Sequence, residues 1–149
     1  MDDESMGWSA PCALFNTKDH LDVGGKPGVY RIRVFTDRNE PMKIRRVNGV
    51  DLLGILHIGK SKNLGLRIRT FRQAAEGLKA AHHAGCEFHE WGFKNIIPRN
   101  RLRYDYAITR TDQEALKMEG ISTRNTGRHI STVHRLMALL AKLANNLFP

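Results

Sequence analysis

The chain has 149 residues, 41% of them hydrophobic and 26% charged, which suits one globular domain with a sizeable core. Its formal charge of +9 and isoelectric point near 10.0 favour a polyanionic partner, and nucleic acid is the commonest one inside cells. The two cysteines make neither a disulfide framework nor a plausible four-ligand zinc site, and no apolar run approaches the ~20 residues of a membrane span.

The start of the chain also bears on where the protein works. Asp2–Glu4 is acidic, the wrong sign for a secretory signal, so we expect a soluble cytoplasmic protein that does not bind membranes. A basic surface that serves only solubility is the alternative to a binding face. Three runs rich in cations favour the binding face: Lys43–Arg46, Arg67–Arg69 and Arg99–Arg103.

Residues 1–26 are uneven in composition and are expected to form a partly ordered N-terminal arm. Within the arm, Trp8 and Phe15 are the side chains that would pin it to a core. Residues 27–149 are expected to form a single domain, because no composition shift, repeat or low-complexity tract divides them.

Three strands are predicted at the start of this domain. Tyr30–Phe35 mixes β-branched and aromatic residues with polar ones in near alternation, as in a half-buried strand. Met42–Val47 is predicted as a strand that the hairpin signal Asn48-Gly49 turns into the next one. Leu52–Ile58 is a more continuous apolar run, which predicts a central strand.

A basic helix is predicted to follow, with Ser61 as its N-terminal cap. Arg67 lies beside the helix's apolar stripe and is therefore expected close to the sheet rather than in bulk water. The stripe residues are spaced by four, three and four positions: Leu64, Ile68, Phe71 and Ala75.

The regular pattern decays over residues 76–100, where only Leu78–Ala84 is predicted to form another turn or two of helix. Three histidines and a cysteine crowd into eight residues here, a spacing that favours a structural or surface role over a zinc site. The alternative is a substrate-contacting insert, with Trp91 and Phe93 available to stack on bases. The crowded residues are His82, His83, Cys86 and His89.

The last third predicts another strand and two helices. Leu102–Thr109 alternates as a strand, and Thr111–Glu114 is a capping-box sequence that begins a helix with Glu119 on its inward half. A loop is expected at Arg124–Gly127, followed by a core-packing helix over Val133–Leu147. The elements together predict an α/β (α+β) fold, with a small, mainly antiparallel central sheet flanked by helices.

Three segments resemble the GIY-YIG nuclease superfamily, and its excision-repair branch in particular: Gly28-Val29-Tyr30, His57–Leu64 and Arg67. Members of this family also place a metal-binding glutamate on a later helix, a position that Glu119 fits. The similarity spans most of the chain. His57 stands where the family usually has tyrosine.

The resemblance implies a metal-dependent endonuclease that hydrolyses DNA phosphodiester bonds, with four catalytic residues. Glu119 would hold one Mg²⁺ or Mn²⁺ ion, and the planar fork of Arg67 would bind the phosphate. Tyr30 would be the base or position the water, although a phenol with a pKa of about 10 needs nearby cations for this. His57, with an ordinary pKa of ~6.5, is suited to take over the proton.

Five further residues near these four are assigned to phosphate contacts, which position DNA without reading its sequence: Lys60, Lys62, Asn63, Arg69 and Arg72. Two alternatives stay open. One is a nucleic-acid-binding module of the same fold with impaired catalysis, and the other is a domain whose basic face meets an acidic protein. The sequence does not decide between a monomer and a transient dimer.

Overall fold

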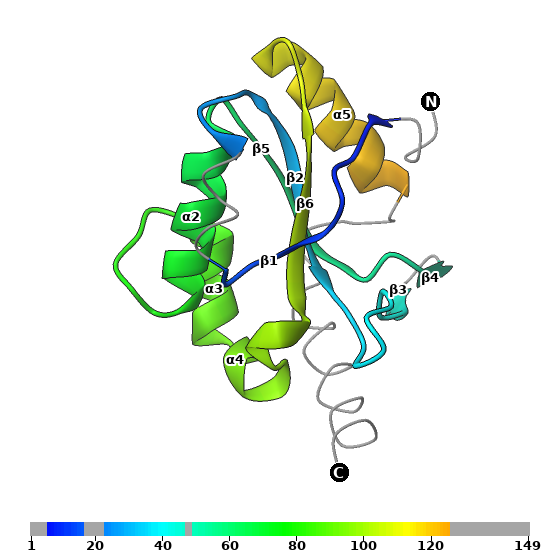
Figure 1. Ribbon diagram of the computed structural model, residues 1–149, viewed down its shortest axis with the longest axis vertical. Coiled ribbons are helices and arrows are strands. Elements are labelled where there is room, and N and C mark those ends of the chain that lie inside the picture. Colours follow the sequence, from blue (N-terminus) through cyan, green and yellow to red (C-terminus); the bar gives the residue numbers. More distant parts are fainter. Residues whose placement is uncertain (1–5, 17–22, 47–48, 126–149) are drawn as a thin grey trace.

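The structure is a computed structural model that describes residues 6–16, 23–46 and 49–125 (Figure 1). Its main sheet is antiparallel, with four strands in the order β1-β6-β2-β5, and confirms the predicted α+β class. These strands are β1 (Cys12–Ala13), β2 (Gly28–Val34), β5 (Ile55–Ser61) and β6 (Leu102–Ile108). Strands β3 (Ile44–Arg46) and β4 (Gly49–Asp51) pair separately as a hairpin.

Helices cover both faces of this sheet (Figure 1). One face carries α2 (Leu64–Ala75), α3 (His83–Glu90) and α4 (Phe93–Ile96), while α5 (Asp112–Asn125) packs on the other face against β5 and β2. A short 3-10 helix, η2 (Arg99–Arg101), leads into β6. None of the described helices has both the length and the apolar character that crossing a bilayer requires.

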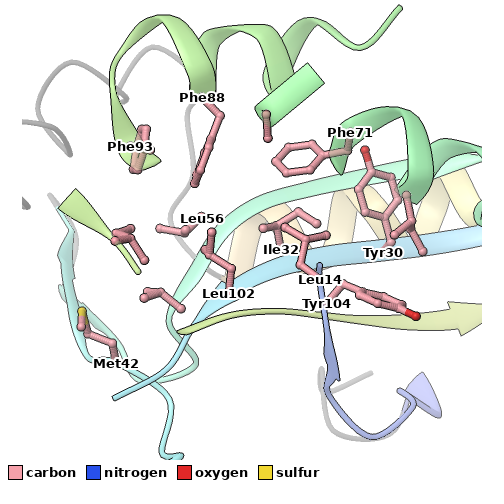
Figure 2. Close-up of a cluster of buried hydrophobic side chains, with 14 of the residues drawn as sticks. Leu14, Tyr30, Ile32, Met42, Leu56, Phe71, Phe88, Phe93, Leu102 and Tyr104 are labelled. Atoms are coloured by element: carbon pink, nitrogen blue, oxygen red, sulfur yellow. The ribbon is translucent and has the colours of Figure 1, made fainter. Parts of the chain in front are cut away.

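Two apolar clusters follow from this layering. The larger one lies between the sheet and α2, α3 and α4, and includes Tyr30 and Ile32 of β2 together with Phe71 of α2 (Figure 2). The smaller one joins Val29 of β2 to Ala115 of α5. Because successive side chains of a strand point to opposite faces, β2 supplies residues to both clusters and is buried along its whole length.

The prediction that β2 is half-buried is therefore wrong, and its arginines explain how polar residues fit inside. Arg31 donates from Nε and Nη2 to the two carboxylate oxygens of Asp105, each at 2.7 Å, and Arg33 Nη1 donates to Oδ2 at 2.6 Å. The guanidinium of Arg31 also lies 3.6 Å from the ring centroid of Trp8. Charged side chains are buried here because each finds a charged partner.

Two details of the strand and helix predictions are also wrong. Leu52–Ile58 was expected to be central, but β5 is an edge strand of the described sheet. It is nevertheless apolar because α2 and α5 cover its two faces. Helix α2 forms as predicted, yet its cap is Asn63, whose Oδ1 accepts from the Leu66 amide at 3.0 Å, while Ser61 ends β5.

The insert differs most from its prediction. Leu78–Ala84 is mainly a loop, and the helices α3 and α4 lie further along the chain. Gly85 disguised α3, since glycine weakens helices, but a Cβ at this position would lie 2.7 Å from the Phe71 carbonyl oxygen. The glycine is therefore required where α3 crosses closely over α2. Helix α5 likewise continues to Asn125, whereas the sequence predicts a loop from Arg124 onward.

The N-terminal arm contributes to the fold. Strand β1 pairs with β6, and Leu14 is fully buried in the larger cluster, with Phe15 packed against it. Two predictions, the turn residue Asn48 and the helix over Val133–Leu147, fall outside the described residues.

Candidate active site

Tyr30 is the centre of the candidate site and is fully buried. Its ring projects from β2 towards α2 (Figure 2) and lies across the neighbouring strand, where Gly59 is its register partner. A Cβ on Gly59 would lie 2.8 Å from the phenol oxygen and 2.9 Å from Cε1 and Cζ. The glycine of the second motif is therefore what allows the phenol to occupy this position.

The phenol oxygen contacts two imidazoles. It lies 3.1 Å from Nε2 of His57 on β5 and 2.7 Å from Nε2 of His82, the residue that precedes α3. The His57 ring is stacked on Phe71 with centroids 5.8 Å apart, and the His82 ring meets Phe71 edge-on at 5.0 Å. These contacts fix both imidazoles beside the phenol.

His82 is the site residue that sequence reasoning missed. It is only 2% exposed, and its Nδ1 accepts from the Gly85 amide at 3.3 Å, so it is the N-cap of α3. Burial, assisted by the charge of Arg67, lowers the pKa of His82 from 6.5 to about 4, and the ring is neutral at pH 7. The only signal in the sequence was its place three residues before Gly85, and the neighbouring histidines obscured it.

Arg67 supplies the positive charge of the site. It lies beside the buried stripe of α2, as predicted, and its Nη1 donates to the Ala81 carbonyl at 3.4 Å. Its charge reaches three site groups and shifts their proton affinities: the phenol of Tyr30, the imidazole of His82 and the carboxylate of Glu119.

The protonation of Tyr30 is decided by two opposing effects. Burial raises the pKa of the Tyr30 phenol, whereas the charge of Arg67 and its hydrogen bond to the phenol lower it. Burial is the larger effect, so the pKa lies well above its usual value and the phenol is neutral at pH 7. A free phenolate is therefore not the resting form of this site.

Glu119 approaches from the opposite face of the sheet. It lies on α5, and a hydrogen bond with the Lys60 backbone places its carboxylate beside β5, which is an edge strand. Burial raises the pKa of Glu119, the charges of Lys60 and Arg67 lower it, and Asp112 raises it further. The charge of Arg67 thus lowers the pKa of Glu119 although the helices that carry the two residues lie on different faces of the sheet.

A divalent ion fits the chemistry of Glu119. Its carboxylate is partly buried, and burial raises its pKa by more than the charges of Lys60 and Arg67 lower it, so a further positive charge would stabilise the ionised form. The described residues contain no group of three or more metal-ligating side chains, so an ion here would take most of its ligands from water and substrate. Mg²⁺ binds in this way, through one or two carboxylates together with water and phosphate.

The residues assigned to phosphate contacts do not form a single patch. Lys60 lies beside the site but is paired with Asp112 at 3.1 Å, and the side chain of Asn63 caps α2. Arg69 and Arg72 lie about 160° and 140° around α2 from Arg67, at 100° per residue. Lys62 is exposed at the start of the helix. Their contacts with DNA stay a prediction.

Comparison of this chain with known protein families, with curated proteins and with solved structures finds no significant match. The geometry of the site and the sequence motifs are therefore the basis for assigning a function.

Proposed function

We propose that this protein is a metal-dependent endonuclease that hydrolyses DNA phosphodiester bonds in the cytoplasm. The observation that supports the proposal is the contact of the buried Tyr30 phenol with His57, in a place that the charges of Arg67 and Glu119 both reach. The four residues follow one another in the order that the GIY-YIG resemblance implies, with His57 where that family usually has tyrosine.

Tyr30 and His57 would deprotonate the attacking water together. Because the phenol stays neutral, the water passes its proton to the oxygen of Tyr30 while the phenol proton moves to Nε2 of His57. The O–H bond of water breaks, the oxygen attacks phosphorus, and His57 ends as the imidazolium. This transfer avoids a phenolate, whose formation burial opposes.

Arg67 would bind the phosphate and also open the site. In the present arrangement Tyr30 is fully buried, with Arg67 beside its oxygen. When the guanidinium turns to a phosphate, whose oxygens match its planar fork, a water can take its place beside the phenol. The negative charge that grows on the phosphate during attack then strengthens the contact.

Glu119 is the residue that would hold the divalent ion. A bound Mg²⁺ or Mn²⁺ supplies Lewis-acid stabilisation of charge on the phosphate and leaving oxygens. The exposed Lys62 would bind the DNA backbone on the approach to the site.

Both cysteines are thiols, which agrees with a reducing cellular compartment.

The complete burial of Tyr30 favours a second candidate function. A phenol that water never reaches cannot take part in hydrolysis, and the same basic fold would then be a nucleic-acid-binding module without catalysis. The two candidates differ in one measurable property, which is metal-dependent cleavage.

A plasmid-nicking assay with Mg²⁺, with Mn²⁺ and with chelator tests the proposal. We expect cleavage only with metal, and a loss of about 100-fold or more in Tyr30→Phe and in His57→Ala with DNA binding retained. DNA binding without cleavage under any metal condition would support the binding module instead. Unchanged cleavage in both variants would remove the two residues from the mechanism.

A further inference from the structure

We propose that His82 is a positioning residue that fixes the direction of the hydrogen bond between Tyr30 and His57. This inference rests on the proposed function, because it explains how the phenol becomes the donor to His57. It concerns a residue outside the motifs, in the insert between α2 and α3.

The hydrogen bond at Nδ1 determines the tautomer of His82. Its Nδ1 accepts a hydrogen bond from the backbone N–H of Gly85 at 3.3 Å, so this nitrogen carries a lone pair. A neutral imidazole has one protonated nitrogen, and in His82 this is therefore Nε2. The ring is 2% exposed and neutral, which removes the doubly protonated form from consideration at pH 7.

The short contact of His82 with the phenol determines which way the phenol proton points. Nε2 of His82 lies 2.7 Å from the Tyr30 oxygen and, since it carries the proton, donates to that oxygen. The phenol has one proton of its own to place. Nε2 of His82 already carries a proton, and Arg67 has no acceptor atom. The phenol therefore donates its proton to Nε2 of His57, at 3.1 Å.

The result is a hydrogen-bond chain with one direction, from the Gly85 amide through His82 and Tyr30 to Nε2 of His57. His57 is then protonated at Nδ1 in the resting state. Without His82 the phenol can equally well accept from His57, and in that orientation Nε2 of His57 already carries a proton and cannot take the one from the phenol. The direction of the chain thus prepares the proton transfer required for hydrolysis.

The geometry also separates the two roles of His82 by atom. Nδ1 caps helix α3, while Nε2 orients the phenol. Asparagine reproduces the position of Nδ1 and is a good N-cap, whereas glutamine reproduces a donor at the position of Nε2. His82→Asn and His82→Gln therefore form a matched pair, one keeping the cap and the other keeping the donor.

Nicking kinetics on this pair test the role in the reaction. We expect kcat to fall about 100-fold in His82→Asn with little change in KM, and His82→Gln to keep most of the wild-type kcat. Equal losses in the two variants, or no loss in His82→Asn, would overturn the proposal, since a purely structural residue would behave in one of these ways.

Imidazole ¹⁵N chemical shifts test the tautomers without any activity, in the wild-type protein and in Tyr30→Phe. We expect His82 to be protonated at Nε2 and His57 at Nδ1, with Nε2 of His57 losing its hydrogen-bond shift in Tyr30→Phe. A proton on Nδ1 of His82, or on Nε2 of His57, would overturn the proposal. If the tautomers are as expected and no DNA is cut, the endonuclease assignment fails while the hydrogen-bond chain stands.

Discussion

At the scale of single residues, the position of one phenol depends on a residue with no side chain. Gly59 lies opposite Tyr30 in the register of β2 and β5, and any Cβ there would overlap the phenol ring. The glycine of the second motif thus has a steric reason that does not depend on its resemblance to any family. The contacts of Tyr30 with His57 and His82 exist only because the ring can lie across β5.

Gly59→Ala is therefore expected to displace Tyr30. Overpacking of this kind costs about 1–3 kcal/mol of stability, and the displaced phenol should lose its bonds to both imidazoles, so cleavage should fall with it. Urea unfolding and nicking assays measure the two effects. Gly25→Ala is the matched control, because its nearest atom would be Asn63 Nδ2 at 3.6 Å, an ordinary contact. An unchanged Gly59→Ala protein would contradict the placement of the ring.

The pH dependence of stability reports on His82. Burial and the charges of Arg67 and His83 lower its pKa to about 4 in the folded protein, and its other titratable neighbours are Tyr30 and His57. Between pH 6.5 and pH 4 the unfolded chain binds a proton that the folded protein refuses. The contribution of His82 to the free energy of unfolding is therefore fully present above pH 6.5 and is lost as the pH falls to 4.

A shift from 6.5 to about 4 corresponds to a loss of roughly 3 kcal/mol over this window. Urea unfolding of the wild type and of His82→Gln at several pH values from 7 to 4 measures it. We expect the decline to be smaller in His82→Gln, which has no imidazole at this position. Parallel curves for the two proteins would show that His82 is not the group responsible.

At the scale of elements, the sequence predicted what local patterns determine. The strand at Tyr30, the helix at Leu64 and the strand at Leu102 all appear where the apolar spacing put them. The helix predicted at Thr111 also begins there, with the Glu114 amide donating to Thr111 Oγ1 at 3.2 Å. Periodicity and caps involve neighbours in the chain, and this is why they are legible in a sequence.

The features that the sequence did not predict depend on distant pairs. Asp105 neutralises Arg31 and Arg33, which lie 74 and 72 positions earlier in the chain. Because of this pairing, β2 is fully buried rather than half-buried. His82 meets Tyr30 across 52 positions, through an insert whose glycines concealed α3. No local pattern records which polar side chains will meet inside the fold, so burial depth and the third member of the site were missed.

Helix α5 carries Glu119, the residue that we propose holds the divalent ion. A divalent ion that binds Glu119 in the folded protein and not in the unfolded chain should stabilise the fold by about 2.7 kcal/mol at 100 times Kd. We expect Mg²⁺ or Mn²⁺ to raise the melting temperature of the wild type and not that of Glu119→Gln. Glu114→Gln, an exposed position on the same helix, is the control and should respond like the wild type. An equal response in Glu119→Gln would place the ion elsewhere.

At the scale of the whole molecule, the formal charge of +9 overstates the positive charge that is available to a polyanionic partner. Arg31 and Arg33 are buried with Asp105 on the α5 side of the sheet, and Arg46 is paired with Asp51 at 2.7 Å. At the surface, Arg99 lies 3.2 Å from Glu76. The cations left for a polyanion include Lys62 and the guanidinium of Arg67.

DNA binding should therefore weaken steeply with salt, through a limited number of phosphate contacts. We expect Lys62→Ala to reduce the slope of log K against log salt by about 1, because one phosphate contact is lost. Arg99→Ala, which removes a cation already paired with Glu76, should leave the slope unchanged. Fluorescence anisotropy over a salt series gives these slopes, and a flat response in the wild type would argue against nucleic acid as the partner.

Charged side chains of the protein itself form hydrogen bonds with the backbone of the edge strand β5. The guanidinium of Arg46 bonds the Ile55 carbonyl, the Asp51 carboxylate accepts from the Ile55 amide at 3.0 Å, and Glu119 engages the Lys60 backbone at the other end. A strand of another molecule could pair with β5 only by displacing these three side chains. Glu119, the proposed metal ligand, thus also protects this edge from pairing with another chain, and its replacement is expected to make the edge more prone to aggregation.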